Sequence, residues 1–192
     1  MRILLFEESR DRAELVREGL ARAGHDVVVT IGSAMDLLPA IERARPDVIV
    51  IDTESPSRDA IEHLCVVTQS SPRPIVMFAS DDRGDAIREA LRAGVSAYIV
   101  DGIEPARVRA IIEVAVARFE EFQRMRGDLA DAQAKLRERK LVERAKGLLM
   151  TQRGLAEDEA YHALRKLAMQ KKQRLGEIAQ QLIDAAELLR KA

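Results

Sequence analysis

Short apolar runs alternate with amphipathic stretches through the first 120 residues of the chain. Within each run, consecutive positions are apolar, which is typical of strands buried on both faces of a parallel sheet. The stretches between them repeat apolar residues at three- and four-residue spacing, which predicts helices. Together they predict an α/β domain that is doubly wound around a parallel sheet. The expected strands are 2–6, 26–30, 47–51, 74–78 and 97–100, and the expected helices lie near 11–23, 34–44, 58–69, 84–93 and from 105 onward.

The segment from 105 to 140 predicts one long connecting helix. An apolar seam runs through residues 111–136, and Phe122, Leu129 and Leu136 in it are seven residues apart. This spacing is typical of a coiled coil. The seam therefore has two interpretations, a homodimer that forms through residues 111–136 or packing within one chain.

The last third of the chain predicts three short helices around a small core. The first, from Leu141, ends at Gly154, because glycine adopts the left-handed conformation that closes a helix at little cost. The second follows Ala156, which is a poor N-cap, so the acids at 157–159 must stabilise that helix start. The third spans 175–189, and all three carry an apolar stripe.

Basic residues are concentrated at the start of this helical region. The chain of 192 residues has a formal net charge of −1, but residues 139–174 contain ten basic residues against four acidic ones, a balance of +6. Such a local excess is typical of surfaces that bind nucleic acid. A helix face with solvated charges is the alternative that composition leaves open.

Three motifs in this region resemble the ANTAR domain, a three-helix module that binds RNA. They are AKGLLM at 145–150, EAYHALRKLA at 159–168 and LGEIAQQLID at 175–184. The resemblance implies binding to hairpins in nascent leader mRNA, which prevents a terminator from forming. The signature positions and the neighbouring cations give an expected RNA-binding set of Lys146, Gly147, Met150, Arg153, Tyr161, Arg165 and Lys166.

Elementary chemistry gives several of these residues a role. Lys146 and Arg165 can neutralise phosphates or bond to a base edge, and Tyr161 can stack on a base that leaves a hairpin loop. Gly147 would let RNA or a partner helix approach closely, at a cost in helix stability. Packing in the core remains the alternative for Tyr161 and Met150.

The segment LGEIAQQL at 175–182 also looks like the first helix of a DNA-binding helix-turn-helix. A turn and a recognition helix should follow it, but the chain continues as IDAAELLRKA without glycine, proline or a polar turn. We therefore expect RNA rather than DNA.

Acidic residues follow two of the expected strands. Glu7 and Glu8 come after the first strand and Asp52 after the third, so they should meet at the carboxyl edge of the sheet. Converging carboxylates repel one another unless a cation lies between them. The domain resembles the flavodoxin-like response-regulator receiver, in which such acids bind magnesium and the position of Asp52 accepts a phosphoryl group.

Two positions depart from the receiver pattern. The lysine expected after the fifth strand is Asp101, which would repel a phosphoryl group. The hydroxyl residue expected after the fourth strand is displaced, since the usual spacing falls on Ala79 and Ser80 comes one step later. We therefore expect Asp52 to be a vestigial phosphoacceptor. The resemblance implies a possible magnesium ion at Glu7, Glu8 and Asp52, but we expect that the protein requires no cofactor.

Over nearly its full length the chain resembles the NasT-type antiterminators of bacterial nitrate assimilation. The matching segments are DTESPSRDAIEHL from Asp52, AGVSAYIVDG from Ala93 and ERKLVERAKGLLMTQRGL from Glu138. The resemblance implies that a NasS-type nitrate or nitrite sensor holds the receiver-like domain and that ligand binding to the sensor releases it. The expected domains are a degenerate receiver at 1–120, a helical connector at 121–138 and an ANTAR-type domain at 139–192.

Other classes of protein fit the sequence poorly. It contains no glycine-rich phosphate loop and no nucleophile elbow, so we expect no enzymatic activity. No apolar stretch reaches the length of a membrane span, and we expect a cytoplasmic protein. Two alternatives stay open, namely a receiver regulator controlled by phosphorylation and a non-catalytic protein for partner binding or dimerisation.

Overall fold

The computed structural model describes residues 1–100 and 105–191. The chain divides into two compact units, Met1–Gln123 and Arg124–Ala192. Among the described residues, no helix is both long and apolar enough to cross a membrane.

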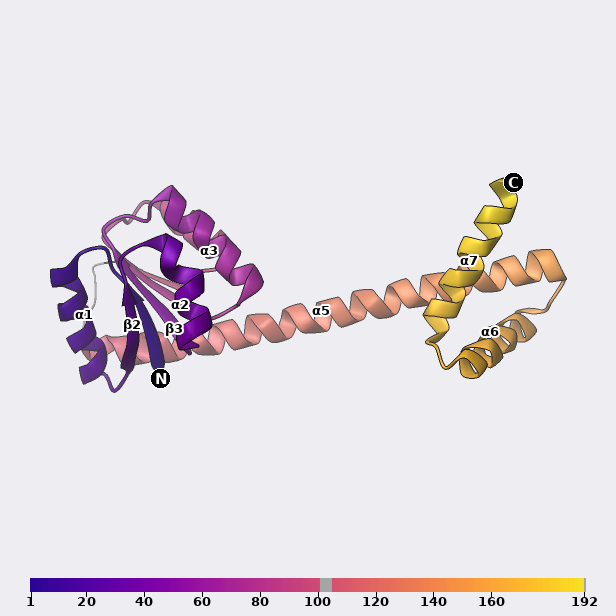
Figure 1. Cartoon of the computed structure of the whole chain (residues 1–192), viewed down its shortest axis with the longest axis horizontal. Helices are drawn as coiled ribbons and strands as arrows, with labels where there is room; N and C mark the ends of the chain where they lie inside the picture. The colour runs from indigo at the N-terminus through magenta and orange to yellow at the C-terminus, as the bar shows by residue number, and fades with distance from the viewer. Residues whose placement is uncertain (101–104, 192) are drawn as a thin grey trace. The chain divides into compact units, whose positions relative to one another are not determined.

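The first unit contains a five-stranded parallel sheet with strand order β2-β1-β3-β4-β5 (Figure 1). This order and the alternation of strands with helices confirm the predicted doubly wound fold. The strands are β1 (Arg2–Phe6), β2 (Asp26–Ile31), β3 (Val48–Thr53), β4 (Ile75–Ala79) and β5 (Ala97–Val100).

Helices cover both faces of this sheet. Leu4 and Ile49 point to one face, where α2, α3 and α4 supply the covering residues, and Ile3 and Val48 point to the other, where α1 and the start of α5 do so. The alternation of consecutive strand residues between two cores explains why the strands are apolar throughout. The helices are α1 (Arg10–Arg22), α2 (Leu37–Ala44) after the short 3-10 turn η1 (Ala34–Asp36), α3 (Arg58–Ser70), α4 (Gly84–Arg92) and α5 (Pro105–Arg153).

The helix α5 is continuous over 49 residues, so the first of the three short helices predicted in the last third is the end of this long helix. It runs through Gly127, because neither a turn nor a proline interrupts it there. Its middle carries exposed apolar side chains: Phe122, Leu129 and Leu136 are between 55% and 59% exposed. From Phe122 onward the predicted seam lies on the surface of the helix, whereas Ile112 and Ala115 at its start are buried in the core of the first unit.

The second unit packs three helical segments around a small apolar core. The end of α5 contributes Val142 and Ala145, α6 (Glu157–Lys171) contributes Leu164, and α7 (Leu175–Lys191) contributes Ile178 and Ile183. Because each segment is amphipathic, their apolar stripes can be buried only against one another. This arrangement confirms the predicted three-helix core.

The chain turns between these helices use the residues that the sequence indicated. Gly154 has φ 67° and follows the last residue of α5. The carboxylate of Glu159 accepts a hydrogen bond from the backbone N–H of Ala156 at 2.9 Å, so an acid in the first turn of α6 satisfies the N-cap that alanine cannot.

Candidate nucleic-acid interface and acidic crevice

Lys146 joins α5 to the first turn of α6. Its ammonium donates to Glu143 at 2.9 Å and to Glu157 at 2.7 Å. These two carboxylates raise the pKa of Lys146, the Glu157 carboxylate most of all, while the ammonium lowers the pKa of Glu157. The residue is only 7% exposed.

This geometry changes the expectation for Lys146, which the sequence suggested as a cation for phosphates or base edges. Lys146 lies on the buried side of α5, one turn after Val142 and next to Ala145, and Glu157 at the start of α6 supplies a carboxylate to it. Periodicity along one helix cannot reveal a partner on another helix. In this structure Lys146 organises the surface, and its charge is already compensated.

The remaining cations of the expected set are exposed. Arg153, near the end of α5, and Arg165 and Lys166 on α6 all face solvent. Among residues 1–100 and 105–191, none of these three side chains forms an ion pair. Their charges are thus available to a polyanion, which the charge of Lys146 is not.

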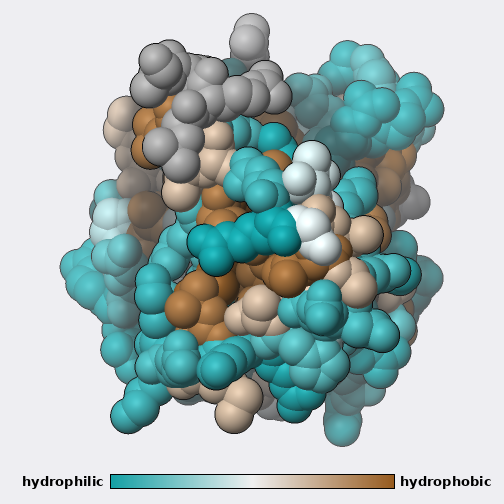
Figure 2. Space-filling model, turned by 90° about the vertical axis from the view of Figure 1, so that its right-hand side faces the viewer, coloured by the Kyte–Doolittle hydropathy of each residue, from teal (hydrophilic) through white to brown (hydrophobic). Residues whose placement is uncertain are grey.

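Two apolar residues of the set are also partly exposed. Tyr161 is 38% exposed and Met150 is 40% exposed, so neither belongs to the core of the second unit. The Tyr161 and His162 rings are nearly perpendicular, with ring centroids 6.2 Å apart and an angle of 86° between the planes. Figure 2 shows exposed hydrophobic side chains among hydrophilic ones at the end of the chain that carries α6 and α7.

Gly147 leaves an open site on the surface of α5. A Cβ atom added there would meet nothing within 4 Å. The Thr151 hydroxyl donates to the Gly147 carbonyl at 2.9 Å, as a residue four positions later in a helix can. No packing within the protein therefore requires glycine here among the described residues, which leaves an approaching partner as a reason for it.

Helical spacing relates these residues to the Lys146 pair. Met150 and Arg153 lie four and seven positions after Lys146 and share its side of α5. Tyr161 and Arg165 lie four and eight positions after Glu157 and share its side of α6. The ion pair thus connects the sides of the two helices that carry Met150, Arg153, Tyr161 and Arg165, whereas Lys166, nine positions after Glu157, lies on the opposite side of α6.

The second candidate site lies at the carboxyl edge of the sheet. Phe6 pairs with Ile51 in the parallel register, so the next residues, Glu7 and Asp52, lie side by side. Both are buried, at 5% and 4% exposed. The structure brings these two predicted acids together, whereas Glu8 is exposed and lies outside the crevice.

Arg12 enters this crevice from the first turn of α1. Its Nη2 atom lies 3.0 Å from Oδ2 of Asp52, and its Nε atom lies 3.6 Å from Oε2 of Glu7. Its Nη1 atom lies 3.8 Å from Oε1 of Glu54, which is otherwise exposed. Each nitrogen of one guanidinium therefore faces a different carboxylate.

Glu7 is held in an unusual charge state. Burial, above all, and then the neighbouring Asp52 carboxyl raise the pKa of Glu7 to about 7. The backbone N–H of Ser9 donates to its Oε1 at 2.9 Å, while its buried Oε2 has no hydrogen-bond partner among the described residues. Near neutral pH the Glu7 carboxyl is therefore only partly ionised.

The residues present do not fit the magnesium ion that the receiver resemblance implies. The expected third ligand, Glu8, is exposed, and Arg12 already faces the oxygens of Glu7 and Asp52. Within the described part of the chain, no group of three or more His, Cys, Asp or Glu side chains is placed to hold a metal ion. The expected magnesium set of Glu7, Glu8 and Asp52 stays a prediction, which this arrangement does not favour.

The positions that depart from the receiver pattern can be compared with the structure. Ala79 ends β4, is buried and has no hydroxyl, and Ser80 is exposed, with its N–H donating to the Glu54 carbonyl at 3.1 Å. The side chain of Asp81 in the same loop accepts from Ser55 at 2.8 Å and pairs with Arg83. Asp101 lies outside the described residues.

Sequence reasoning missed Arg12 because it considered acids alone, and it missed Glu54 because it considered only the acids that directly follow the apolar runs. A signal existed for Arg12. A basic residue in the first turn of the helix that follows β1 starts close to the carboxyl edge of the sheet. The helix dipole gives a cation no advantage there, so a partner was to be expected.

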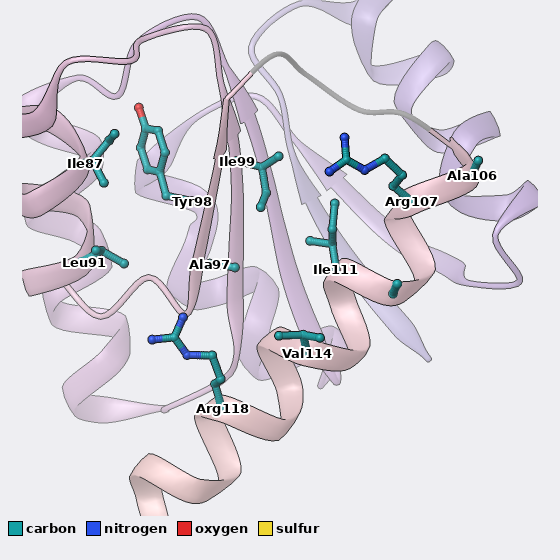
Figure 3. A pocket seen from close by; sticks show the side chains of 11 residues that line it. Ile87, Leu91, Ala97, Tyr98, Ile99, Ala106, Arg107, Ile111, Val114 and Arg118 are labelled. Atoms are coloured by element: carbon teal, nitrogen blue, oxygen red, sulfur yellow. The ribbon is translucent and has the colours of Figure 1, made fainter.

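A shallow apolar pocket of about 550 Å³ lies beside β5 in the first unit (Figure 3). Leu91 comes from α4, Tyr98 from β5, and Ile111 and Val114 from α5. Val114 is 58% exposed. Arg107 and Arg118 add two cations to a lining that is mostly apolar.

Two family models match the chain and fit the two units. The response regulator receiver domain matches residues 3–113, and the ANTAR domain matches residues 130–183. The chain belongs to the response-regulator receiver family, in the class whose receiver is followed by an ANTAR domain. Members of this class are RNA-binding transcription regulators and not enzymes.

Individual relatives support the assignment. The transcriptional regulatory protein PdtaR of Mycobacterium tuberculosis is 30% identical over 187 residues, which cover 95% of this chain and 89% of that protein. The nitrate regulatory protein of Klebsiella oxytoca is 49% identical over 70 residues, or 36% of this chain and 18% of that protein. The signal receiver domain of a modulated diguanylate cyclase from Desulfovibrio desulfuricans G20 shares the fold, with 20% identity and a TM-score of 0.54 over 62% of this chain and 95% of that structure.

Proposed function

We propose that the protein binds hairpins in nascent leader mRNA and prevents a downstream terminator from forming. The observation that carries this proposal is the exposed, unpaired set of cations on the ANTAR domain, within the described residues, next to exposed Tyr161 and Gly147. A polyanion would meet positive charge, an aromatic ring and a helix surface without a side chain. Nascent transcripts place this activity in the cytoplasm.

The chemistry of each residue suggests its role. Arg153, Arg165 and Lys166 neutralise phosphates, and the guanidinium groups can also bond to a base edge. Tyr161 stacks on a base that leaves the hairpin loop. Gly147 and the neighbouring Met150 offer a surface that the backbone of the RNA can approach closely.

The test is a titration of the full chain with a two-hairpin leader RNA, a scrambled RNA and a DNA duplex over a range of salt concentrations. Arg165→Ala and Lys166→Ala should each reduce the slope of log affinity against log salt by about 0.7–0.9. Arg92→Ala, an exposed cation of the first unit, serves as the control. Equal binding to all three nucleic acids, or unchanged slopes in the two variants, would contradict the proposal.

We further propose that the regulated genes serve nitrate or nitrite assimilation and that a NasS-type sensor protein controls the regulator. Three observations support this part: the resemblance of the whole chain to NasT-type antiterminators, the printed name of the Klebsiella oxytoca relative, and the apolar pocket beside β5. The test is a leader-reporter fusion in cells that carry or lack the sensor. Equal terminator readthrough in cells that carry the sensor and in cells that lack it would contradict this part of the proposal.

Control by a protein partner is favoured over phosphorylation. Asp52 pairs with Arg12, and Ala79 has no hydroxyl to bind a phosphoryl oxygen. Asp52→Asn should therefore leave hairpin affinity within about twofold of the wild type. If this variant kept its fold but lost readthrough in cells, phosphorylation would be the better account.

A homodimer through the exposed part of the seam, from Phe122 to Leu136, would present two ANTAR domains to two hairpins. The exposure of Phe122, Leu129 and Leu136 at seven-residue spacing supports it. Leu129→Glu should shift the mass measured by sedimentation equilibrium towards the monomer, while Lys135→Glu, on the same helix, should not. A wild-type protein that is monomeric at all concentrations would leave packing against another protein as the explanation.

A further inference from the structure

One guanidinium lies among three carboxylates at the carboxyl edge of the sheet. The nitrogens of Arg12 lie 3.0 Å from Asp52, 3.6 Å from Glu7 and 3.8 Å from Glu54. We propose that Arg12 takes the place of a divalent cation in this crevice, so that the receiver-like unit holds a cation there without metal and becomes a metal site only when Arg12 is removed.

The position of Arg12 is built into the chain around it. Ser9 is the N-cap of α1, and its hydroxyl accepts from the backbone N–H of Arg12 at 3.5 Å. The N–H of Ser9 in turn donates to Glu7 at 2.9 Å. The turn between β1 and α1 therefore holds Glu7 at one end and Arg12 at the other, and the guanidinium reaches Asp52 across the sheet edge.

A metal ion would compete for the same oxygens. Magnesium prefers oxygen ligands at about 2.0–2.1 Å in octahedral geometry. Oδ2 of Asp52 is the acceptor for Arg12, and Oε2 of Glu7 is buried, without a hydrogen bond among the described residues, and faces the Arg12 Nε atom. A dication that reached these atoms would lie within a few ångströms of a guanidinium, and like charges at that distance repel strongly.

Removal of the Arg12 guanidinium should allow a metal ion to bind the carboxylate oxygens. Glu7 and Asp52 would then be two buried acids with no cation between them, and Glu54 could turn in from the surface. An oxygen-lined crevice with uncompensated charge is the setting in which divalent cations bind. The wild-type crevice and the Arg12 variant thus differ by one charge at a single place.

The experiment measures manganese binding to the full-length protein by the decrease in the electron paramagnetic resonance signal of free Mn²⁺. Arg12→Ala and Arg12→Gln should bind Mn²⁺ at least about tenfold more tightly than the wild type, because a charge of the same sign has been removed from the site. Arg17→Ala, which removes an exposed cation paired with Glu14 on the same helix, should behave like the wild type.

The double variant Arg12→Ala, Asp52→Asn tests whether Mn²⁺ binds in this crevice. It should lose the Mn²⁺ affinity that Arg12→Ala gains. Circular dichroism of each variant establishes that the fold is intact, and Arg12→Gln keeps a long side chain should Arg12→Ala fail to fold. Two results would overturn the proposal: Mn²⁺ binding by the wild type as tight as by the folded Arg12 variants, or a gain in affinity that survives in the double variant. Unchanged affinity in both Arg12 variants would overturn it equally.

Discussion

The ammonium of Lys146 lies 2.7 Å from the carboxylate of Glu157 and couples α5 to α6. Glu157 shares its side of α6 with Tyr161, and Gly147 is the next residue of α5. The ion pair is therefore placed to set the distance between the two helix faces that we assign to RNA. We therefore infer that Lys146, a residue of the family signature, stabilises the surface that we assign to RNA through its ion pair with Glu157.

Lys146→Ala should lower the melting temperature of the protein more than Lys166→Ala does. The first change leaves the carboxylates of Glu143 and Glu157 without their cation and removes the link between two helices, whereas Lys166 is exposed and forms no ion pair among the described residues. Thermal unfolding followed by circular dichroism measures both variants. A Lys146→Ala protein that melts like the wild type but does not bind hairpin RNA would show instead that Lys146 contacts RNA directly.

Gly147→Ala should separate stability from binding. The new methyl group meets no atom of the protein within 4 Å, so the free energy of unfolding should rise by about 0.5–1 kcal/mol through better helix propensity. Affinity for hairpin RNA should fall about tenfold, or by about 1.4 kcal/mol, if the RNA approaches this face closely. Urea unfolding and an RNA titration measure the two quantities.

Gly127→Ala is the matched control for this prediction. Gly127 lies on the same helix, and an added Cβ atom there also meets nothing within 4 Å. It should give the same gain in stability without the loss of RNA affinity. Equal RNA affinities for the wild type and both variants would remove the close-approach role of Gly147.

Gly176→Ala should destabilise the C-terminal unit. An added Cβ atom would lie 2.9 Å from Cγ of Glu138, whose carboxylate accepts from the Gly176 N–H at 3.3 Å near the start of α7. Displacement of Glu138 should cost about 1–2 kcal/mol in the free energy of unfolding. In the double variant with Glu138→Ala the two effects should be less than additive, since the clash is absent. Strict additivity in a urea-unfolding cycle would show that the two residues do not interact.

Glu7→Gln should change how stability depends on pH. Folding raises the pKa of Glu7 to about 7, so the folded state favours the protonated form. The resulting stabilisation is complete below the ordinary pKa of a glutamate and is lost as pH rises through about 7. Glutamine stays neutral, so the variant should be more stable than the wild type at pH 8 by up to about 3 kcal/mol and similar to it at pH 5.

Urea unfolding at several pH values tests this prediction. Burial, first of all, lowers the pKa of His25, so His25 contributes stability that is present above its ordinary pKa and is lost as pH falls. This effect has the opposite sign, but it is common to both proteins and cancels in their difference. Glu8→Gln is the control, because Glu8 is exposed. A difference between wild type and Glu7→Gln that does not vary with pH would contradict the raised pKa.

The secondary structure followed closely from the sequence because burial in this fold repeats along each element. The strand expected at 47–51 is found at Val48–Thr53, and the helix expected near 58–69 is found at Arg58–Ser70. Gly154 and the acids after it predicted the turn and the start of α6 for reasons that are local to the chain. The extent of α5 was harder to see, because the connector and the first ANTAR helix have no turn residue between them.

The candidate sites could be predicted from the sequence only in part. The meeting of Glu7 with Asp52 could be predicted, since parallel strands bring their carboxyl ends to one edge. The entry of Arg12 between them could not, because a flexible side chain chooses its partner only when α1 has packed beside the sheet. For the same reason, the exposure of Tyr161 and Met150 had to come from the packing of the second unit.

The sequence by itself determined the order of elements, the two-domain plan, the excess of positive charge and the membership of the receiver and ANTAR classes. These properties depend on spacing and composition, which are written along the chain. Only the tertiary structure decided that Lys146 is compensated by Glu157 and that Asp52 is compensated by Arg12. Charges separated by 11 and 40 positions interact through space, at distances that folding alone sets.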